Sequence, residues 1–144
     1  MNAVTVGAID HVGLRVADKE RALAFYGRLG FRVDPDEDAP AAKAIGLVND
    51  AGARIHLIYN ASATHPHGNV LMDGAAKLPG YTHAAFVVHD MDALLRTFER
   101  WGLHITEGPM VVANGRRRLC FVRDPDSNVL EFNELLRHGD PPAL

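Results

Sequence analysis

Apolar and polar residues follow the same order twice along this chain, at a constant offset of 72 residues. Residues 9–18 align without a gap on residues 81–90. The alignment continues through matching aliphatic, aromatic, basic and glycine positions: Leu23 with Leu95, Tyr26 with Phe98, Arg28 with Arg100 and Gly30 with Gly102. So many coincidences at one offset indicate an internal duplication.

Each copy has a pattern that predicts one helix and four strands. An apolar run with β-branched residues predicts a strand, and an aspartate then predicts the N-cap of a helix with apolar residues at helical spacing. Gly30 and Gly102 predict the helix ends, because glycine adopts the left-handed conformation without strain. Three strand-like stretches follow in each copy: 31–33, 44–48 and 54–59 in the first, and 103–106, 117–123 and 128–133 in the second. Each half therefore predicts a βαβββ module.

The organisation predicted for the whole chain is one α+β domain, residues 1–144, made of two tandem βαβββ modules. The modules span about 8–60 and 80–135, and residues 61–79, rich in Ala, Gly, His and Pro, predict the loop that joins them. An open sheet with one helix leaves its second face bare, so we expect the mixed sheets of the two halves, or of two chains, to pack together and enclose a metal site.

Composition and charge exclude several classes of protein. The chain is 47% hydrophobic and 23% charged, as is typical of soluble globular proteins. Fifteen basic and 18 acidic residues give a net charge of −3, which argues against nucleic acid or a membrane surface as a partner. No signal-like segment or long apolar run is present, and Cys120 in an apolar run predicts a buried thiol. We therefore expect a cytoplasmic protein.

The repeat also selects four candidate metal ligands among the polar residues. His11 and His83 occupy the same position in the two copies, and His56 and Glu131, 45 and 48 residues further on, lie in the last predicted strands. The pseudo-symmetry would bring these two pairs to matching places in one concave space. Imidazole and carboxylate suit zinc, nickel, cobalt, manganese or iron, and such sites keep a position open for water or substrate. One divalent metal and a catalytic role are therefore predicted.

The duplicated module, His11, His83 and the segment 124–131 resemble the vicinal oxygen chelate superfamily over residues 8 to about 135. This superfamily contains glyoxalase I, methylmalonyl-CoA epimerase, extradiol dioxygenases, fosfomycin-resistance enzymes and metal-free bleomycin-binding proteins. The resemblance is closest to glyoxalase I, through residues 11–16, 55–60 and the Asp-Pro-Asp segment.

The resemblance to glyoxalase I implies specific roles for six residues. It implies that His11, His56, His83 and Glu131 bind the metal. It implies that Glu131 or His56 moves a proton between adjacent carbons of a glutathione hemithioacetal. Arg15 and Asn60 match positions that contact glutathione, which implies substrate binding. Exchange of modules between two chains is common in the superfamily, which implies a homodimer.

One departure from glyoxalase I leaves alternatives open: His56 stands where that enzyme carries a carboxylate. His11, His83 and Glu131 alone equally resemble the two-His, one-carboxylate site of ferrous extradiol dioxygenases, with His56 outside the ligand shell. A third interpretation is a protein that binds an antibiotic or another planar ligand without a catalytic metal. Because all four positions hold metal-capable residues, we favour a metal-dependent lyase or isomerase acting on a small oxygen-chelating substrate.

Overall fold

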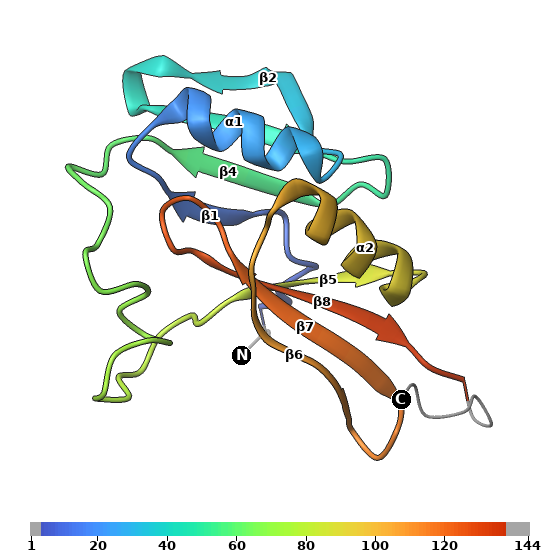
Figure 1. Cartoon of the computed structure of the whole chain (residues 1–144). Coiled ribbons are helices and arrows are strands. Elements are labelled where there is room, and N and C mark those ends of the chain that lie inside the picture. Colours follow the sequence, from blue (N-terminus) through green and yellow to red (C-terminus); the bar gives the residue numbers. More distant parts are fainter. Residues whose placement is uncertain (1–3, 138–144) are drawn as a thin grey trace. The chain divides into compact units, whose positions relative to one another are not determined.

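The computed structural model describes residues 4–137, which form two compact units, the first ending at Thr64 and the second beginning at His65. The first unit contains β1 (Val12–Arg15), α1 (Lys19–Arg28), β2 (Arg32–Ala39), a 3₁₀ turn (Pro40–Ala42), β3 (Ala44–Val48) and β4 (Arg54–Ile58). The second contains β5 (Ala84–Val88), α2 (Met91–Trp101), β6 (Ile105–Val112), β7 (Arg117–Arg123) and β8 (Val129–Leu135). Each unit thus follows the predicted βαβββ order (Figure 1), and the α+β fold class is confirmed.

Both sheets are mixed and share one topology. The strand order is β1-β4-β3-β2 in the first unit and β5-β8-β7-β6 in the second. The first strand of each module pairs in parallel with the last, and the other pairs are antiparallel. The last strand therefore lies inside its sheet, with a neighbour on each side.

The helices begin at the predicted N-caps. The Asp18 carboxylate accepts a hydrogen bond from the backbone N–H of Arg21 at 2.9 Å, and Asp90 accepts one from Ala93 at 2.8 Å. Helix α2 ends at Gly102, whose φ of 65° is left-handed, as predicted. Helix α1 ends earlier, and Gly30 adopts its left-handed φ of 88° just beyond the cap.

Side chains of the central strands alternate between an apolar face and a polar face. The buried positions are Ile55 and Leu57 in β4, and Leu130 and Phe132 in β8. His56 and Glu131 alternate with them and therefore lie on the other face of each sheet. In each unit one face thus carries the hydrophobic core and the other is left for polar side chains.

The core of the second unit includes aromatic rings and the single cysteine. The ring of Phe98 in α2 packs against Phe132 with centroids 5.3 Å apart. Cys120 is fully buried, and desolvation raises the pKa of its thiol to about 11. The prediction of a buried strand thiol is confirmed, since such a group is protonated at neutral pH.

Strands β2 and β6 are longer than the sequence predicted. Each has eight residues, whereas only 31–33 and 103–106 were expected. Both strands contain a register irregularity, between Val33 and Asp38 and between Ile105 and Met110. A bulge breaks the period-two alternation on which a strand prediction depends, which explains the shorter expectation.

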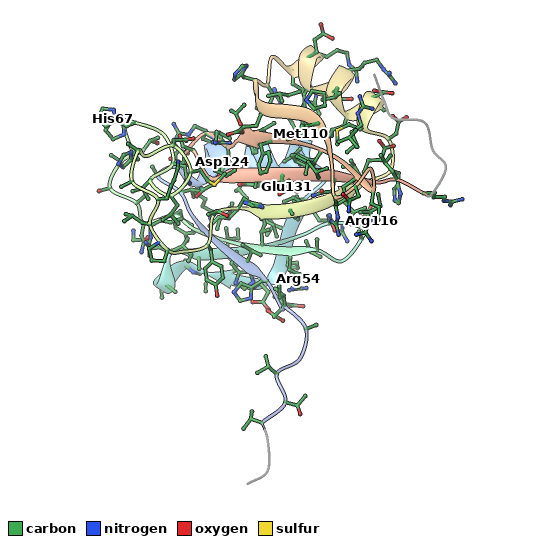
Figure 2. All side chains as sticks on the ribbon, turned by 90° about the horizontal axis from the view of Figure 1, so that it is seen from below. Arg54, His67, Met110, Arg116, Asp124 and Glu131 are labelled. Carbon is green, nitrogen blue, oxygen red and sulfur yellow. The ribbon has the colours of Figure 1, made fainter. Side chains whose placement is uncertain are left out.

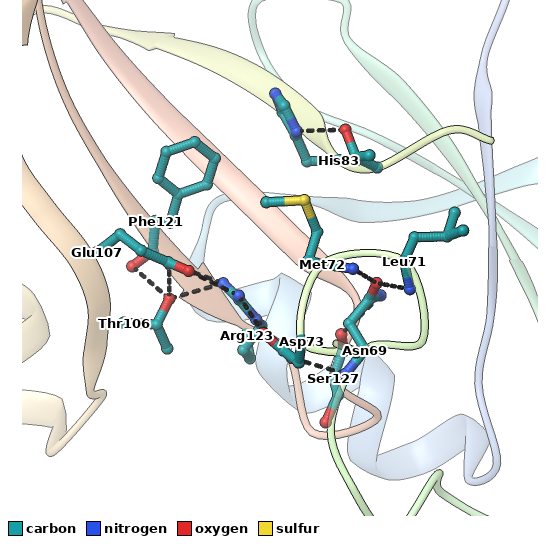
Figure 3. Close-up of polar contacts among 12 residues, drawn as sticks. Asn69, Leu71, Met72, Asp73, His83, Thr106, Glu107, Phe121, Arg123 and Ser127 are labelled. Carbon is teal, nitrogen blue, oxygen red and sulfur yellow. Dashed lines mark hydrogen bonds and ion pairs between the residues drawn. The ribbon is translucent and has the colours of Figure 1, made fainter. Parts of the chain in front are cut away.

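The segment between the modules has no helix or strand, but it is anchored to the second unit (Figure 3). The Asn69 side chain accepts hydrogen bonds from the backbone of Leu71 and Met72 and donates one to the Ser127 carbonyl. The Asp73 carboxylate accepts hydrogen bonds from Arg123 at 2.8 and 3.3 Å.

Arg123 extends this anchor into the sheet. Its guanidinium also donates to the Glu107 carboxylate, at 2.8 and 3.0 Å. The hydrogen bonds from Arg123 lower the pKa of Asp73 and of Glu107. The arginine thus joins the connecting segment to β6 and β7. In the part of the chain that the structure describes, no helix is long and apolar enough to span a bilayer.

The Asp73–Arg123 contact should make stability depend on pH. A carboxyl whose pKa is lowered by folding contributes stability above its unfolded pKa of about 4, and this contribution is lost as pH falls through the folded pKa. Asp73→Asn should therefore lower the urea midpoint at pH 7, and its difference from the wild type should shrink as the pH falls below about 4. The exposed Asp38→Asn serves as the control. A difference that stays constant from pH 7 to pH 3 would contradict the assignment.

Candidate metal centre

Parallel pairing of the first and last strands places the predicted ligands in the same relation in both units. Gly13 of β1 is the partner of His56, and Ala85 of β5 is the partner of Glu131. His11 and His83 each precede these partners by two residues and share their face of the sheet. Each histidine is therefore a diagonal neighbour of the ligand candidate on the last strand. The structure brings the four residues together as two pairs, one in each unit.

The pair in the second unit is a direct contact between two side chains of metal-binding type. His83 Nε2 lies 2.7 Å from Glu131 Oε2, a hydrogen-bond distance, and both side chains are mostly buried, with 30% and 12% exposed. Glu131 lies on β8 (Figure 2), and its second oxygen accepts a hydrogen bond from Asn133 Nδ2 at 2.7 Å. Imidazole nitrogen and carboxylate oxygen are both ligands of divalent metals. The pair thus provides two adjacent donors of the kind that a metal site uses.

His11 and His83, which directly precede β1 and β5, are held through the same ring nitrogen. His11 Nδ1 lies 2.6 Å from Asp10 Oδ2, and His83 Nδ1 lies 2.8 Å from Thr82 Oγ1. Asp10 and Thr82 are equivalent positions of the repeat. The hydrogen bond with His11 lowers the pKa of Asp10. A hydrogen bond at Nδ1 orients an imidazole and leaves Nε2 for a metal.

His56 is held differently, because its ring stacks on that of His11. The ring centroids are 3.7 Å apart and the planes differ by 11°. Imidazole lone pairs lie in the ring plane, so two nearly parallel rings do not converge on one ion. His56 Nε2 is buried without a hydrogen-bond partner among the described residues, and Glu37 Oε2 lies 3.9 Å away.

The donors fit a metal in kind, but neither unit alone provides enough of them. Among residues 4–137, no group of three or more His, Cys, Asp or Glu side chains is placed to hold a metal. Metal sites of this donor type use three or four protein ligands. Each pair therefore supplies two donors of the kind that such a site uses, fewer than the three or four that it needs.

The two predicted substrate-binding residues lie next to each other. Arg15 Nε donates to Asn60 Oδ1 at 3.0 Å, and both side chains are exposed. The pairing of β1 with β4 brings them together, because Arg15 is the partner of Ile58. A guanidinium held in this way can bind a carboxylate through charge-assisted hydrogen bonds.

The Asp-Pro-Asp segment forms the hairpin connection that leads into Glu131. Asp124 is buried, and its carboxylate accepts hydrogen bonds from the backbone of Asp126 and Asn128 and from the Asn128 side chain, at 2.8 to 2.9 Å. These bonds fix the turn between β7 and β8. The motif therefore sets the register in which Glu131 lies.

Sequence reasoning did not find four residues that contact the candidate ligands: Asp10, Glu37, Thr82 and Asn133. The repeat could have indicated Asp10 and Thr82, which precede equivalent histidines. Asn133 stands two residues after Glu131, on the same strand face. Glu37 left no signal, because it lies in the irregular part of β2.

Comparisons with known proteins support the fold and the family. The sequence model of the Glyoxalase/Bleomycin resistance protein/Dioxygenase superfamily matches residues 8–132. The chain is 30% identical over 129 residues to a probable lactoylglutathione lyase of Vibrio cholerae, which covers 85% of this chain and 86% of that protein. It is 27% identical to a lactoylglutathione lyase of Schizosaccharomyces pombe over 87% of this chain, but spans only 44% of that protein.

Solved structures share the architecture at lower sequence identity. A glyoxalase/dioxygenase from Nostoc punctiforme superposes with a TM-score of 0.73 at 20% identity, over 95% of this chain and 99% of that one. A glyoxalase family protein from Bacillus cereus superposes with a TM-score of 0.69 at 20% identity, over the same shares. With its two βαβββ modules and a family match over most of its length, this chain belongs to the glyoxalase/bleomycin resistance protein/dioxygenase superfamily.

Proposed function

We propose that this protein is a metal-dependent lyase or isomerase of the glyoxalase type, acting on a small substrate that chelates the metal through neighbouring oxygens. The observation that carries the proposal is the His83–Glu131 pair, with donor atoms 2.7 Å apart. The superfamily generally uses divalent metal ions. Two relatives are named lactoylglutathione lyase or probable lactoylglutathione lyase, which favours a glutathione hemithioacetal as the substrate.

On this proposal the metal is held by His11, His83 and Glu131, with His56 as the fourth ligand. His11 would use Nε2, because its Nδ1 is bonded to Asp10. For His56 to bind the same ion, its stack with His11 must open. When bound, a divalent ion supplies Lewis-acid polarisation of the substrate oxygens and stabilises negative charge on them.

We assign proton transfer between the adjacent substrate carbons to Glu131 or to His56, the latter if it is displaced from the metal. Asn133 fixes one Glu131 oxygen, which orients the other towards His83. His56 Nε2 has no hydrogen-bond partner among the described residues and lies in a partly buried side chain, 19% exposed. A base that is partly shielded from water is suited to proton transfer once a substrate comes within its reach.

Iron-dependent ring cleavage is a second candidate, favoured by one observation. Because His56 stacks on His11, the two rings do not point at one ion. His11, His83 and Glu131 then form a two-His, one-carboxylate set of the kind that binds ferrous iron. On this alternative His56 contacts a ligand without binding the metal. The homodimer predicted from the sequence stays a prediction.

Metal content tests the ligand assignment. Protein purified without chelator should contain about one equivalent of divalent metal, consistent with a ligand set of three or four side chains. Glu131→Gln should lose most of it, because the change removes the charged ligand while preserving its volume. Glu134→Gln, the same change in the same strand, is the matched control. Elemental analysis is the measurement, and equal metal in Glu131→Gln and the wild type would refute the assignment.

The same analysis on His56→Ala separates the candidate functions. Zinc, nickel, cobalt or manganese that falls in this variant supports the four-ligand glyoxalase-type site. Iron that is insensitive to His56 supports the dioxygenase. If the protein binds no metal, even after reconstitution, both candidate functions are contradicted. The interpretation as a protein that binds a ligand without a metal would then remain.

Substrate binding is tested at Arg15. The wild type should convert the hemithioacetal of methylglyoxal and glutathione into its thioester, followed by ultraviolet absorbance. Arg15→Ala should raise KM by about tenfold or more, the loss expected of a charge-assisted hydrogen bond, and should change kcat little. The exposed Arg32→Ala, in the same unit, is the control. A lowered kcat with unchanged KM would contradict a role for Arg15 in substrate binding.

A further inference from the structure

Glu37 is an acidic residue that the fold turns towards His56, one of the two candidate ligands in the first unit. It lies in β2 within the register irregularity between Val33 and Asp38. Bulges redirect side chains and are common next to active sites. The side chain of Glu37 is 45% exposed, and its carboxylate lies 3.9 Å from His56 Nε2.

Gly46 provides the space for this approach. It lies in β3 as the partner of His56. A Cβ atom at Gly46 would stand 2.5 Å from the Cβ of Glu37 and 3.3 Å from His56 Nε2. Contacts of 2.5 Å do not occur between real side chains, so any residue other than glycine would displace Glu37. A glycine inside a strand often marks such a close approach.

The two oxygens of Glu37 face different nitrogen groups. Oε2 lies 3.9 Å from His56 Nε2, the buried nitrogen without a hydrogen-bond partner. Oε1 lies 3.6 Å from Arg54 Nη2, and the same nitrogen forms a shorter ion pair, at 2.6 Å, with Asp34 Oδ2. Arg54 is therefore satisfied mainly by Asp34. A buried ring nitrogen without a partner is costly, and a movement of about 1 Å by the exposed Glu37 would satisfy it.

We propose that Glu37 is a positioning residue of the metal centre, which holds the His56 imidazole through Nε2. The inference rests on the proposed function. In this role Glu37, in strand β2, supplies a negative charge next to His56. Glyoxalase I carries a carboxylate at the position that corresponds to His56. Carboxylates that hold a metal-binding histidine orient its ring and make it a stronger ligand.

This assignment gives His56 the opposite orientation from the other two histidines. His11 and His83 are held through Nδ1, which leaves Nε2 for the metal. A His56 ring held through Nε2 presents Nδ1 instead. The carboxylate also adds a charge that favours a divalent cation nearby.

Titration of the full-length protein with Co²⁺, in competition with a chromophoric chelator, tests the proposal with two complementary variants. Glu37→Gln keeps the shape and removes the charge. Gly46→Ala keeps the charge and forces the carboxylate away from His56. Each should weaken Co²⁺ binding by about tenfold, the lower end for loss of such a partner. Asp36→Asn, a carboxylate removed from the same stretch of β2, should leave the affinity within about twofold.

The visible absorption of bound Co²⁺ provides a second readout, since it depends on the ligands around the ion rather than on stability. We expect the bands to shift in Glu37→Gln and to stay unchanged in Asp36→Asn. Circular dichroism checks that each variant is folded, and Glu37→Gln decides the matter if Gly46→Ala does not fold.

Two results would overturn the proposal in distinguishable ways. Wild-type affinity and spectrum in Glu37→Gln, with binding lost in His83→Ala, would exclude Glu37 and leave the proposed function standing. Equal Co²⁺ binding by the wild type and His83→Ala, or none by either, would remove the proposed metal centre and this inference with it.

Discussion

The candidate site depends on one constraint, the parallel pairing of the first strand of each module with its last. This pairing inserts β4 and β8 into the interior of their sheets and fixes the register of His56 and Glu131. Because side chains alternate along a strand, a shift of one residue would turn these ligand candidates into the hydrophobic core. The buried residues on either side of them, such as Ile55 and Leu130, make such a shift costly. Packing of the core thus holds the polar face in place.

The sequence contained most of the information on the fold because the duplication doubled each signal. The helix caps at Asp18 and Asp90, the βαβββ order and the pairing of each histidine with its partner on the last strand could all be predicted. Each depends on local patterns or on the equivalence of the two copies. The family match over residues 8–132 agrees with the resemblance that these residues suggested.

What the sequence did not show depends on contacts between residues that are distant along the chain. The stack of His11 on His56 and the approach of Glu37 require the register of several strands. The basic run at 116–118 gave no sign that Arg118 is buried, 8% exposed, and pairs with Asp92 of α2 at 2.8 Å. The connecting loop gave no sign of its anchor on Arg123.

This chain has His56 where glyoxalase I has a carboxylate, and this difference changes the charge of the proposed ligand set. With Glu131 as its one carboxylate, the set of four residues carries a single negative charge, and the remaining donors are neutral imidazoles. Donors of this kind suit several first-row metals, so the availability of metal and the surrounding charges decide which one binds. Glu37 is the acidic group that the fold brings nearest to His56 among the described contacts.

X-ray absorption of the zinc-loaded protein tests most directly the proposal that His11, His83 and Glu131 bind one metal. We expect a first shell of nitrogen and oxygen at about 2.0–2.1 Å, with outer-shell scattering from at least two imidazoles. This imidazole signal should decrease in His11→Ala and, separately, in His83→Ala, since one histidine comes from each module. A shell without imidazole, or one that is unchanged in either variant, would contradict the account.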